Sequence, residues 1–358
     1  MTTAAPRRRI GIVGVGSYLP ARRRTNEDIA ATAGVTPDWI TRRTGVRGRH
    51  VAAPEEAASD LAAAAVKSAA GAADLDLDRI GLLVVATSTP DELGPSTACR
   101  VQAHVRARDA VALDVTAACS GWLFAAKVAH DWLALDDRPR YAAVVGVEAY
   151  SKFLDLSDRA TAVLFADGAA ATVFGPVPED GGFLGFALGS NGELADHALI
   201  PAGGSRHPAS LTTLESRGHK VTMNGPGVRD FIVDIFPRIV ADALRRHHLT
   251  LADIAVVITH QPNPVLLQRV AHAAGITPRQ LVIVGDEVGN IGAASIPYGL
   301  ATAVADGRLN PGDLVLFVAF GGGVTWGTAL LRWTGASAIR TAPGAAHRAR
   351  PRPCANLA

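Results

Sequence analysis

An internal repeat constrains the fold of this 358-residue chain more than any other feature of its sequence. Three stretches of the first half recur in the second half, in one order and at an offset of about 174 residues. The pairs are "LDRIGLLVVATSTP" (77–90) with "LADIAVVITHQPNP" (251–264), "DVTAACSG" (114–121) with "GNIGAASIP" (289–297), and "RYAAVVGVEAYS" (140–151) with "DLVLFVAFGGGV" (313–324). Such a series indicates a duplicated half-domain, although two unrelated α/β halves would also share apolar patterns.

Short apolar runs alternate with alanine-rich helical patterns along the whole chain. Continuous apolar runs are typical of strands covered on both faces. We therefore predict strands at 10–16, 80–88, 110–116, 141–148, 169–177, 255–260, 281–286, 313–321 and 327–333. Helical patterns occupy 54–71, 227–247 and 264–274. This alternation predicts an α/β fold, in which binding sites lie beyond the carboxyl ends of the strands.

The repeat divides the chain into an N-terminal half (1–178), a C-terminal half (179–335) and a tail (336–358). The tail contains Ala, Pro and Arg without periodicity, and we predict that it is disordered. Its Cys354 is therefore an incidental thiol. The 48% of hydrophobic residues in the whole chain can form a sizeable core.

Charge and cysteine content exclude several classes of protein. A net charge of +2 gives no reason to expect a nucleic-acid partner. Three cysteines make no disulfide framework in a chain of this length, which favours a cytoplasmic location. No apolar run reaches the roughly 18 residues that span a membrane. The spacing of Cys and His predicts no zinc site, and "GVGSYL" (14–19) lacks the third glycine of a dinucleotide fingerprint.

Cys119 stands between a predicted strand, "VALDV" (111–115), and a mostly apolar helix, "SGWLFAAKVAHDWLA" (120–134). The unpaired N–H groups and the dipole of a helix N-terminus stabilise a thiolate and lower its pKa. A lone cysteine in apolar surroundings can equally be a small buried hydrophobe. The repeat pairs "AAC" (117–119) with "AAS" (293–295), so only one copy of this corner carries a thiol.

Three further stretches carry polar or glycine residues where predicted strands end. His260 follows an apolar strand in "VVITHQPNP", although a lone histidine is often structural. Asn290 lies between glycines in "GNIG", where it forms either a turn or a hydrogen-bond donor facing a pocket. The glycines of "AFGGGVTWG" (319–327) either form a flexible turn or aim backbone N–H groups at a ligand.

Taken together, "TAACSG", "THQPN", "GNIGAAS" and "GGGVTWG" resemble the β-ketoacyl-acyl-carrier-protein synthase III family of the thiolase superfamily. The resemblance covers roughly residues 8–334. It implies a thiolase-like α/β fold in which duplicated βαβαβαββ halves form five layers, α-β-α-β-α. It also implies a homodimer that uses acyl-CoA and malonyl thioesters as substrates and needs no cofactor or metal.

The resemblance assigns roles to the residues singled out above. Cys119 would take an acyl group from acyl-CoA, and the backbone N–H groups of Cys119 and Gly323 would form the oxyanion hole. His260 and Asn290 would bind the carbonyl of malonyl-acyl-carrier protein or malonyl-CoA while carbon dioxide leaves. The carbanion would then attack the acyl group, which yields a β-ketoacyl product that primes fatty acid or polyketide synthesis.

Family position also implies contacts with coenzyme A. Trp39 would stack on the adenine, Arg43 and Arg159 would lie near the nucleotide, and Asn263 would bind the pantetheine arm. Core packing is the alternative role for Trp39. Gly94 stands where the family often has a bulky aromatic residue that caps the acyl pocket across the dimer interface, so a longer starter group is permitted here.

Two alternatives are weighed against this interpretation. Some members of the family pass the acyl group to an alcohol or amine without decarboxylation, but the presence of His260 and Asn290 favours condensation. A non-catalytic partner subunit would lack the nucleophile, whereas Cys119 is present. The long polar stretch 189–227 resembles that of members from natural-product pathways.

Overall fold

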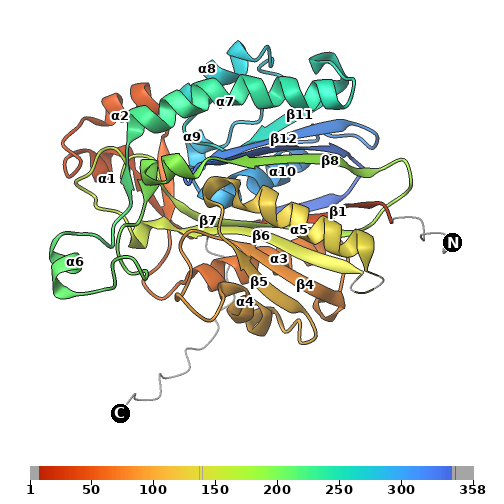
Figure 1. The fold of residues 1–358 in the computed structure, drawn as a ribbon, viewed down its shortest axis with the longest axis horizontal. Coiled ribbons are helices and arrows are strands. Elements are labelled where there is room, and N and C mark those ends of the chain that lie inside the picture. Colours follow the sequence, from red (N-terminus) through yellow and green to blue (C-terminus); the bar gives the residue numbers. More distant parts are fainter. Residues whose placement is uncertain (1–7, 137, 139, 341–342, 344–358) are drawn as a thin grey trace.

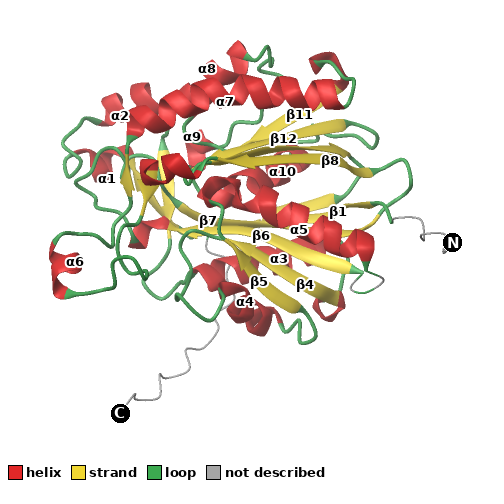
Figure 2. Cartoon of the chain, in the orientation of Figure 1, coloured by secondary structure: helices red, strands yellow, loops and turns green. Residues whose placement is uncertain are grey.

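Two twisted sheets form the frame of the computed structural model, which describes residues 8–136, 138, 140–340 and 343 (Figures 1 and 2). The larger sheet has the order β14 (Ser337–Arg340), β1 (Ile10–Tyr18), β7 (Asp167–Pro176), β6 (Tyr141–Ala149), β4 (Ile80–Ala86), β5 (Val111–Val115). The smaller sheet has the order β11 (Ile254–Thr259), β12 (Leu314–Gly321), β13 (Thr325–Arg332), β8 (Gly182–Ser190).

Helices cover both faces of both sheets and complete five layers (Figure 1). α5 (Gly121–Leu135) and α10 (Ser295–Ala305) lie between the sheets. α3 (Ala58–Ala72) and α4 (Thr97–Val105) cover the outer face of the larger sheet, and α7 (Gly225–Arg246) and α8 (Pro264–Ala273) that of the smaller sheet. The predicted α-β-α-β-α arrangement is confirmed.

Trp122 of α5 shows how the central layer joins the two sheets. Its buried indole ring lies 6.4 Å from Phe174 of β7 and 5.3 Å from Phe317 of β12, measured between ring centroids. Its Nε1 donates to the Thr172 hydroxyl at 3.2 Å, so the polar atom of this ring is satisfied inside the core. One apolar core therefore spans both halves of the chain.

Smaller elements surround one end of this frame. A hairpin of β2 (Arg22–Thr25) and β3 (Gly48–Val51) encloses α1 (Asn26–Ala30) and α2 (Pro37–Thr44). A pair of short strands, β9 (Ala198–Leu199) and β10 (Thr222–Met223), flanks α6 (Leu211–Glu215), which projects from the body at the left of Figure 1. The short helix α9 (Gly285–Val288) precedes Asn290.

The structure confirms the repeat and corrects one pairing within it. The strand orders β1-β7-β6-β4 and β8-β13-β12-β11 are equivalent in the two sheets. The 3₁₀ turn η2 (Ala118–Ser120) leads into α5 as η6 (Gly292–Ala294) leads into α10. Cys119 is therefore equivalent to Ala293, and not to Ser295 as the match of "AAC" with "AAS" indicated.

The predicted strand 281–286 is wrong except for one bridge between Leu281 and Val257. The Gln261 side chain satisfies the backbone of this segment in place of a neighbouring strand. Its Nε2 donates to the Val282 carbonyl at 3.0 Å, and its Oε1 accepts from the N–H groups of Val284 and Gly285. The strand β8, which is rich in glycine and only partly buried, was not predicted.

The prediction of a disordered tail is wrong for Ser337–Arg340. These residues form β14, which pairs in parallel with β1, and the Ser68 hydroxyl donates to the Ile339 carbonyl at 2.9 Å. Backbone pairing with an open strand edge needs no apolar pattern, so composition could not reveal it. Cys354 and the rest of 344–358 lie outside the described residues.

Among the residues that the structure describes, no helix has the length and apolar character needed to cross a membrane.

Candidate active site

Cys119 lies at the corner between β5 and α5, as the sequence predicts. The backbone turns through Ala118, whose φ of 46° lies in the left-handed region. Thr325 of β13 holds this corner from the other half of the chain, because its hydroxyl donates to the Ala117 carbonyl at 2.9 Å and its carbonyl accepts from Ser120. The thiol is buried, and its residue is 8% exposed.

A glycine segment between β12 and β13 lies directly against the thiol. A Cβ on Gly321 would come within 2.7 Å of the Cys119 backbone nitrogen, so only glycine permits this approach. The backbone N–H groups of Cys119 and Gly322 act on the sulfur in the direction that lowers the pKa of the thiol. Gly322 is therefore a candidate oxyanion-hole donor beside the predicted Gly323, and the assignment of Gly323 stays a prediction.

The surroundings of the thiol oppose its ionisation. Burial raises the pKa of Cys119 to about 12, and the negative charge of Glu148 adds to this rise. The N–H groups of Cys119 and Gly322 and the Tyr150 hydroxyl work in the opposite direction. The expected lowering by the helix N-terminus is therefore outweighed by desolvation, and Cys119 rests as a protonated thiol.

His260 follows β11 and is held as a neutral imidazole. Its backbone N–H donates to the Val318 carbonyl at 3.0 Å, and its ring meets the Phe320 ring edge-on at 5.3 Å. Burial lowers the pKa of His260 to about 3, and a backbone hydrogen bond with Gly292 only partly offsets this. Its Nδ1 is buried and has no hydrogen-bond partner among the described residues.

Asn290 is fixed at both its backbone and its side chain. Its N–H donates to the Leu164 carbonyl at 2.8 Å, and its carbonyl accepts from Ala166 at 2.9 Å. Its Oδ1 accepts from the Gly292 N–H at 3.0 Å, which leaves Nδ2 as the donor end of the amide. His260 and Asn290 therefore both meet Gly292.

The four residues expected to bind coenzyme A lie on adjoining elements. Trp39 and Arg43 belong to α2, which packs so closely on α8 that a Cβ on Gly45 would lie 2.8 Å from Pro264. Asn263 caps α8, and its Oδ1 accepts from the Leu266 N–H at 2.8 Å. Trp39 is partly buried against the cluster of Ile29, Ala30, Ala33, Ile40, Ala162 and Val163.

Arg159 precedes the last two members of that cluster, and both Arg159 and Arg43 are exposed. Trp39 therefore packs on this small core, while Arg43 and Arg159 lie in segments that contribute residues to it. Gly94 lies apart from the buried thiol, on an exposed loop after β4, where an added Cβ would meet no atom within 4 Å. Within one chain, Gly94 does not cap Cys119.

Two functional candidates, Glu148 and Tyr150, were not singled out from the sequence. Glu148 is completely buried at the end of β6, where it accepts hydrogen bonds from the Ser88 N–H, the Thr89 hydroxyl at 2.8 Å and the Ala293 N–H at 3.4 Å. Burial raises the pKa of Glu148 to about 8. The sequence did contain a signal for Glu148. It is an acidic residue at the end of the apolar run "YAAVVGVE", where a buried carboxyl is unusual.

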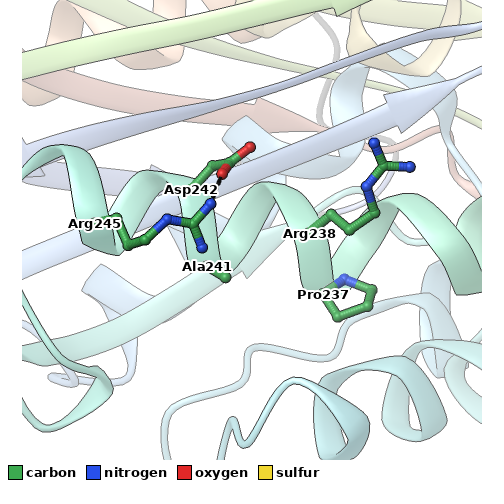
Figure 3. A pocket seen from close by; sticks show the side chains of 5 residues that line it. All are labelled: Pro237, Arg238, Ala241, Asp242 and Arg245. Carbon is green, nitrogen blue, oxygen red and sulfur yellow. Dashed lines mark hydrogen bonds and ion pairs between the residues drawn. The ribbon is translucent and has the colours of Figure 1, made fainter.

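A surface depression on the outer face of α7 is separate from this site (Figure 3). Arg245 forms an ion pair with Asp242 there, and Arg238 pairs with Asp234 at 2.7 Å. All of its lining residues belong to one exposed helix. The described residues also contain no group of three or more His, Cys, Asp or Glu that could hold a metal ion.

A buried thiol beside two backbone N–H groups, with a neutral imidazole and an amide donor near it on a duplicated five-layer frame, defines a thiolase-fold acyltransferase. Comparisons with known proteins narrow this class. Residues 113–192 match the family model "3-Oxoacyl-[acyl-carrier-protein (ACP)] synthase III", and residues 244–333 match the model of its C-terminal region. The chain therefore belongs to the β-ketoacyl-acyl-carrier-protein synthase III family.

Individual relatives cover nearly the whole described fold. A β-ketoacyl-acyl-carrier-protein synthase III of Desulfitobacterium hafniense is 40% identical over 91% of this chain and 98% of that protein. An acetoacetyl CoA synthase of a Streptomyces species is 41% identical over 91% and 99%. The solved 3-oxoacyl-acyl-carrier-protein synthase III of Pseudomonas aeruginosa is 34% identical, with a TM-score of 0.84 over 91% of this chain and 99% of that chain.

Proposed function

We propose that the chain loads an acyl group from acyl-CoA onto Cys119 and condenses it decarboxylatively with a malonyl thioester. One observation supports this above all. The two 3₁₀ turns η2 and η6 contact each other and bring together Cys119, His260 and Asn290, which are far apart in the sequence and come from both halves. A nucleophile and two neutral hydrogen-bond donors are the groups that acyl transfer followed by decarboxylation requires.

In the loading step, the Cys119 sulfur loses its proton and attacks the thioester carbonyl of acyl-CoA. The N–H groups of Cys119 and Gly322 then donate to the oxyanion, and each such donor typically contributes about 10²–10³-fold in rate. The coenzyme A thiolate leaves and takes up a proton. The product is an acyl thioester on Cys119.

In the condensation step, the malonyl thioester carbonyl accepts from His260 and from Asn290 Nδ2. Loss of carbon dioxide leaves an enolate, and both donors stabilise the charge that develops on its oxygen. The enolate carbon attacks the acyl carbonyl, and the Cys119 sulfur leaves. A pKa of about 3 supports this role, because a neutral His260 introduces no competing positive charge. In the tautomer whose N–H faces the substrate rather than Gly292, the imidazole donates to the malonyl carbonyl.

The partners follow from the same site. Trp39, Arg43, Arg159 and Asn263 would hold coenzyme A, and the reaction needs no cofactor besides its substrates. The similar proteins are named both for an acyl-carrier-protein product and for acetoacetyl CoA, so the malonyl group arrives on acyl carrier protein or on coenzyme A. Free Cys99 and Cys119 favour the reducing cytoplasm.

A homodimer is part of this proposal. β5 is the edge strand of the larger sheet, and Val111 on it is 47% exposed. The adjoining loop presents Leu93, which is 84% exposed, next to Gly94. An apolar strand edge of this kind pairs readily with a second copy. That arrangement would bring Gly94 of each chain toward the partner's acyl pocket.

The two half-reactions can be measured separately. Wild type, Cys119→Ala and Asn290→Ala are incubated with a panel of acyl-CoAs, and the intact mass of each protein is read. We expect an adduct on wild type and Asn290→Ala but not on Cys119→Ala. With labelled malonyl-acyl-carrier protein or malonyl-CoA, wild type should release carbon dioxide at least ~10²-fold faster than Asn290→Ala. Ester or amide formation without carbon dioxide would establish the non-decarboxylating acyltransferase instead.

A further inference from the structure

Arg49 of β3 is a buried cation held only by neutral oxygens. Its residue is 1% exposed, and it takes part in no ion pair among the described residues. Nε and Nη2 donate to the Val163 carbonyl at 3.0 and 2.6 Å, and Nη1 donates to Asn26 Oδ1 at 2.8 Å. Burial lowers the pKa of Arg49 to about 10, which leaves it charged at neutral pH. Burying a charge without a counter-ion is costly, so this arrangement calls for a compensating role.

The carbonyl that Arg49 holds belongs to the segment that fixes Asn290. Residue 163 directly precedes Leu164, whose carbonyl accepts the Asn290 N–H at 2.8 Å. Two residues further on, Ala166 donates to the Asn290 carbonyl at 2.9 Å. Four hydrogen bonds thus link the guanidinium to the backbone of Asn290, two from Arg49 to this segment and two between the segment and Asn290.

The stem of Arg49 lies against the residue that precedes Asn290. A Cβ added to Gly289, which precedes Asn290, would lie 3.1 Å from Arg49 Cγ. The Arg49 side chain therefore packs against the residue before Asn290 while its head holds the segment that clamps Asn290. By contrast, the hydrogen bonds of Arg49 to described residues reach only Val163 and Asn26, and neither belongs to η2, where Cys119 lies.

We propose that Arg49 is a positioning residue for Asn290 and acts selectively on the decarboxylation step. This inference rests on the proposed function, in which Asn290 stabilises the enolate while Cys119 carries the acyl group. A fork of two donors on one carbonyl fixes both its distance and its direction, which a single ammonium group cannot do. Without these two hydrogen bonds to the Val163 carbonyl, the Asn290 amide shifts and decarboxylation slows, while the loading step on Cys119 is unaffected.

The test compares both half-reactions in Arg49→Lys and Arg49→Met. Lysine keeps the charge without the fork, and methionine keeps an apolar stem without donors. We expect acyl loading within about twofold of wild type and decarboxylation slower by about 10–100-fold, because a misplacement near 1 Å can cost about 10²-fold. Arg22→Lys, an exposed change on the paired strand β2, is the matched control and should alter neither rate.

A double-mutant cycle separates positioning from general damage. If Arg49 acts through Asn290, Arg49→Lys lowers decarboxylation strongly in wild type and by less than about twofold in an Asn290→Ala background. Equal losses in both half-reactions, unchanged decarboxylation, or full additivity in the cycle would overturn the inference. Wild-type protein that loads acyl groups but releases no carbon dioxide would instead refute the proposed function. The lysine variant carries the test if the methionine variant does not fold.

Discussion

The two halves of the molecule build the same corner twice and use it differently. Each corner is a 3₁₀ turn that opens with a positive φ, 46° at Ala118 and 50° at Gly292, and continues into a buried central helix. The first corner carries Cys119 and faces the glycine segment 321–323. The second carries Ala293 in place of the thiol and lies between Asn290 and the buried carboxyl of Glu148.

Neighbours from other parts of the chain account for this difference. A Cβ on Gly292 would come within 2.7 Å of Glu148 Cγ and 2.9 Å of Tyr150 Cε2, so the second corner requires glycine. The first corner has room for the Ala118 side chain, which an added Cβ on Gly322 would approach only to 3.9 Å. The same backbone motif thus holds the proposed nucleophile in the first corner, and in the second corner it supports the proposed hydrogen-bond donors beside a buried carboxyl.

The largest expected effect on activity comes from replacing Cys119, the residue that distinguishes the first corner from the second. Cys119→Ala should abolish acyl loading and lower product formation by about 10⁴-fold or more, because no other group in the corner can form the thioester. Ser295→Ala is the matched change beside the second corner. Its Oγ is buried without a partner among the described residues, so both rates should stay within twofold. Equal losses in the two variants, read by intact mass and product assay, would contradict the assigned asymmetry.

A smaller effect is expected from the segment that faces only the first corner. Gly321→Ala places a Cβ 2.7 Å from the Cys119 nitrogen, and the clash should displace the N–H donors from the sulfur. We expect acyl loading to slow by about 10²-fold. Gly225→Ala at the start of α7, where an added Cβ meets nothing within 4 Å, controls for the loss of a glycine. Stopped-flow loading with acyl-CoA measures both, and unchanged loading in Gly321→Ala would argue against the donor pair.

Substitutions at the equivalent positions 292 and 118 should change the free energy of unfolding in opposite directions. Gly292→Ala adds a clash with Glu148 and Tyr150 to a left-handed backbone, and should lower the free energy of unfolding by about 1–3 kcal/mol. Ala118→Gly removes the left-handed penalty at the cost of chain entropy, so we expect a change of less than about 1 kcal/mol, toward higher stability. Denaturant titrations of both variants decide this, and a destabilised Ala118→Gly would show that the strain is absent.

The last expected effect is a pH dependence of stability, set by Glu148. Its pKa is raised from 4.5 to about 8, so the folded state binds the proton more tightly and loses stability as pH rises from 4.5 through 8. Glu148→Gln removes this term of roughly 4 kcal/mol, and its melting temperature should gain about 5 °C relative to wild type between pH 5 and pH 8.5. His260 acts in the opposite direction, losing stability as pH falls from 6.5 toward 3, and cancels between the two proteins.

Charge at position 148 also bears on the thiol. Removing it should shift the alkylation profile of Cys119 to lower pH, because Glu148 contributes to the raised pKa of that thiol. The titratable groups that interact with Glu148 are Cys119, Tyr150 and Asp167, and the charge of Asp167 is partly offset by Arg24. An unchanged alkylation profile in Glu148→Gln would mean that the carboxyl is electrostatically silent toward the first corner.

The fold could be predicted wherever local pattern and burial coincide. Continuous apolar runs mark β1, β4, β6, β7, β11 and β12, because these strands are buried on both faces. The same rule failed where a distant group replaced a strand: Gln261 satisfies the backbone of 282–285, and β1 offers an edge to Ser337–Arg340. Neither partner can be inferred from the segment itself.

By itself, the sequence determined the duplicated α/β architecture, because apolar periodicity and turn residues act over a few neighbouring positions. It also singled out Cys119, His260 and Asn290 as candidates, whose roles are what the family resemblance implies. Only the tertiary structure decided that the Gly322 N–H acts on the sulfur and that the thiol is protonated at rest. It also decided that Cys119 and Ala293 occupy equivalent positions in the two halves. It alone revealed Glu148 and Arg49, which join segments far apart in the chain. Desolvation and charge depend on everything that packs around a group, and that is fixed only when the two halves meet.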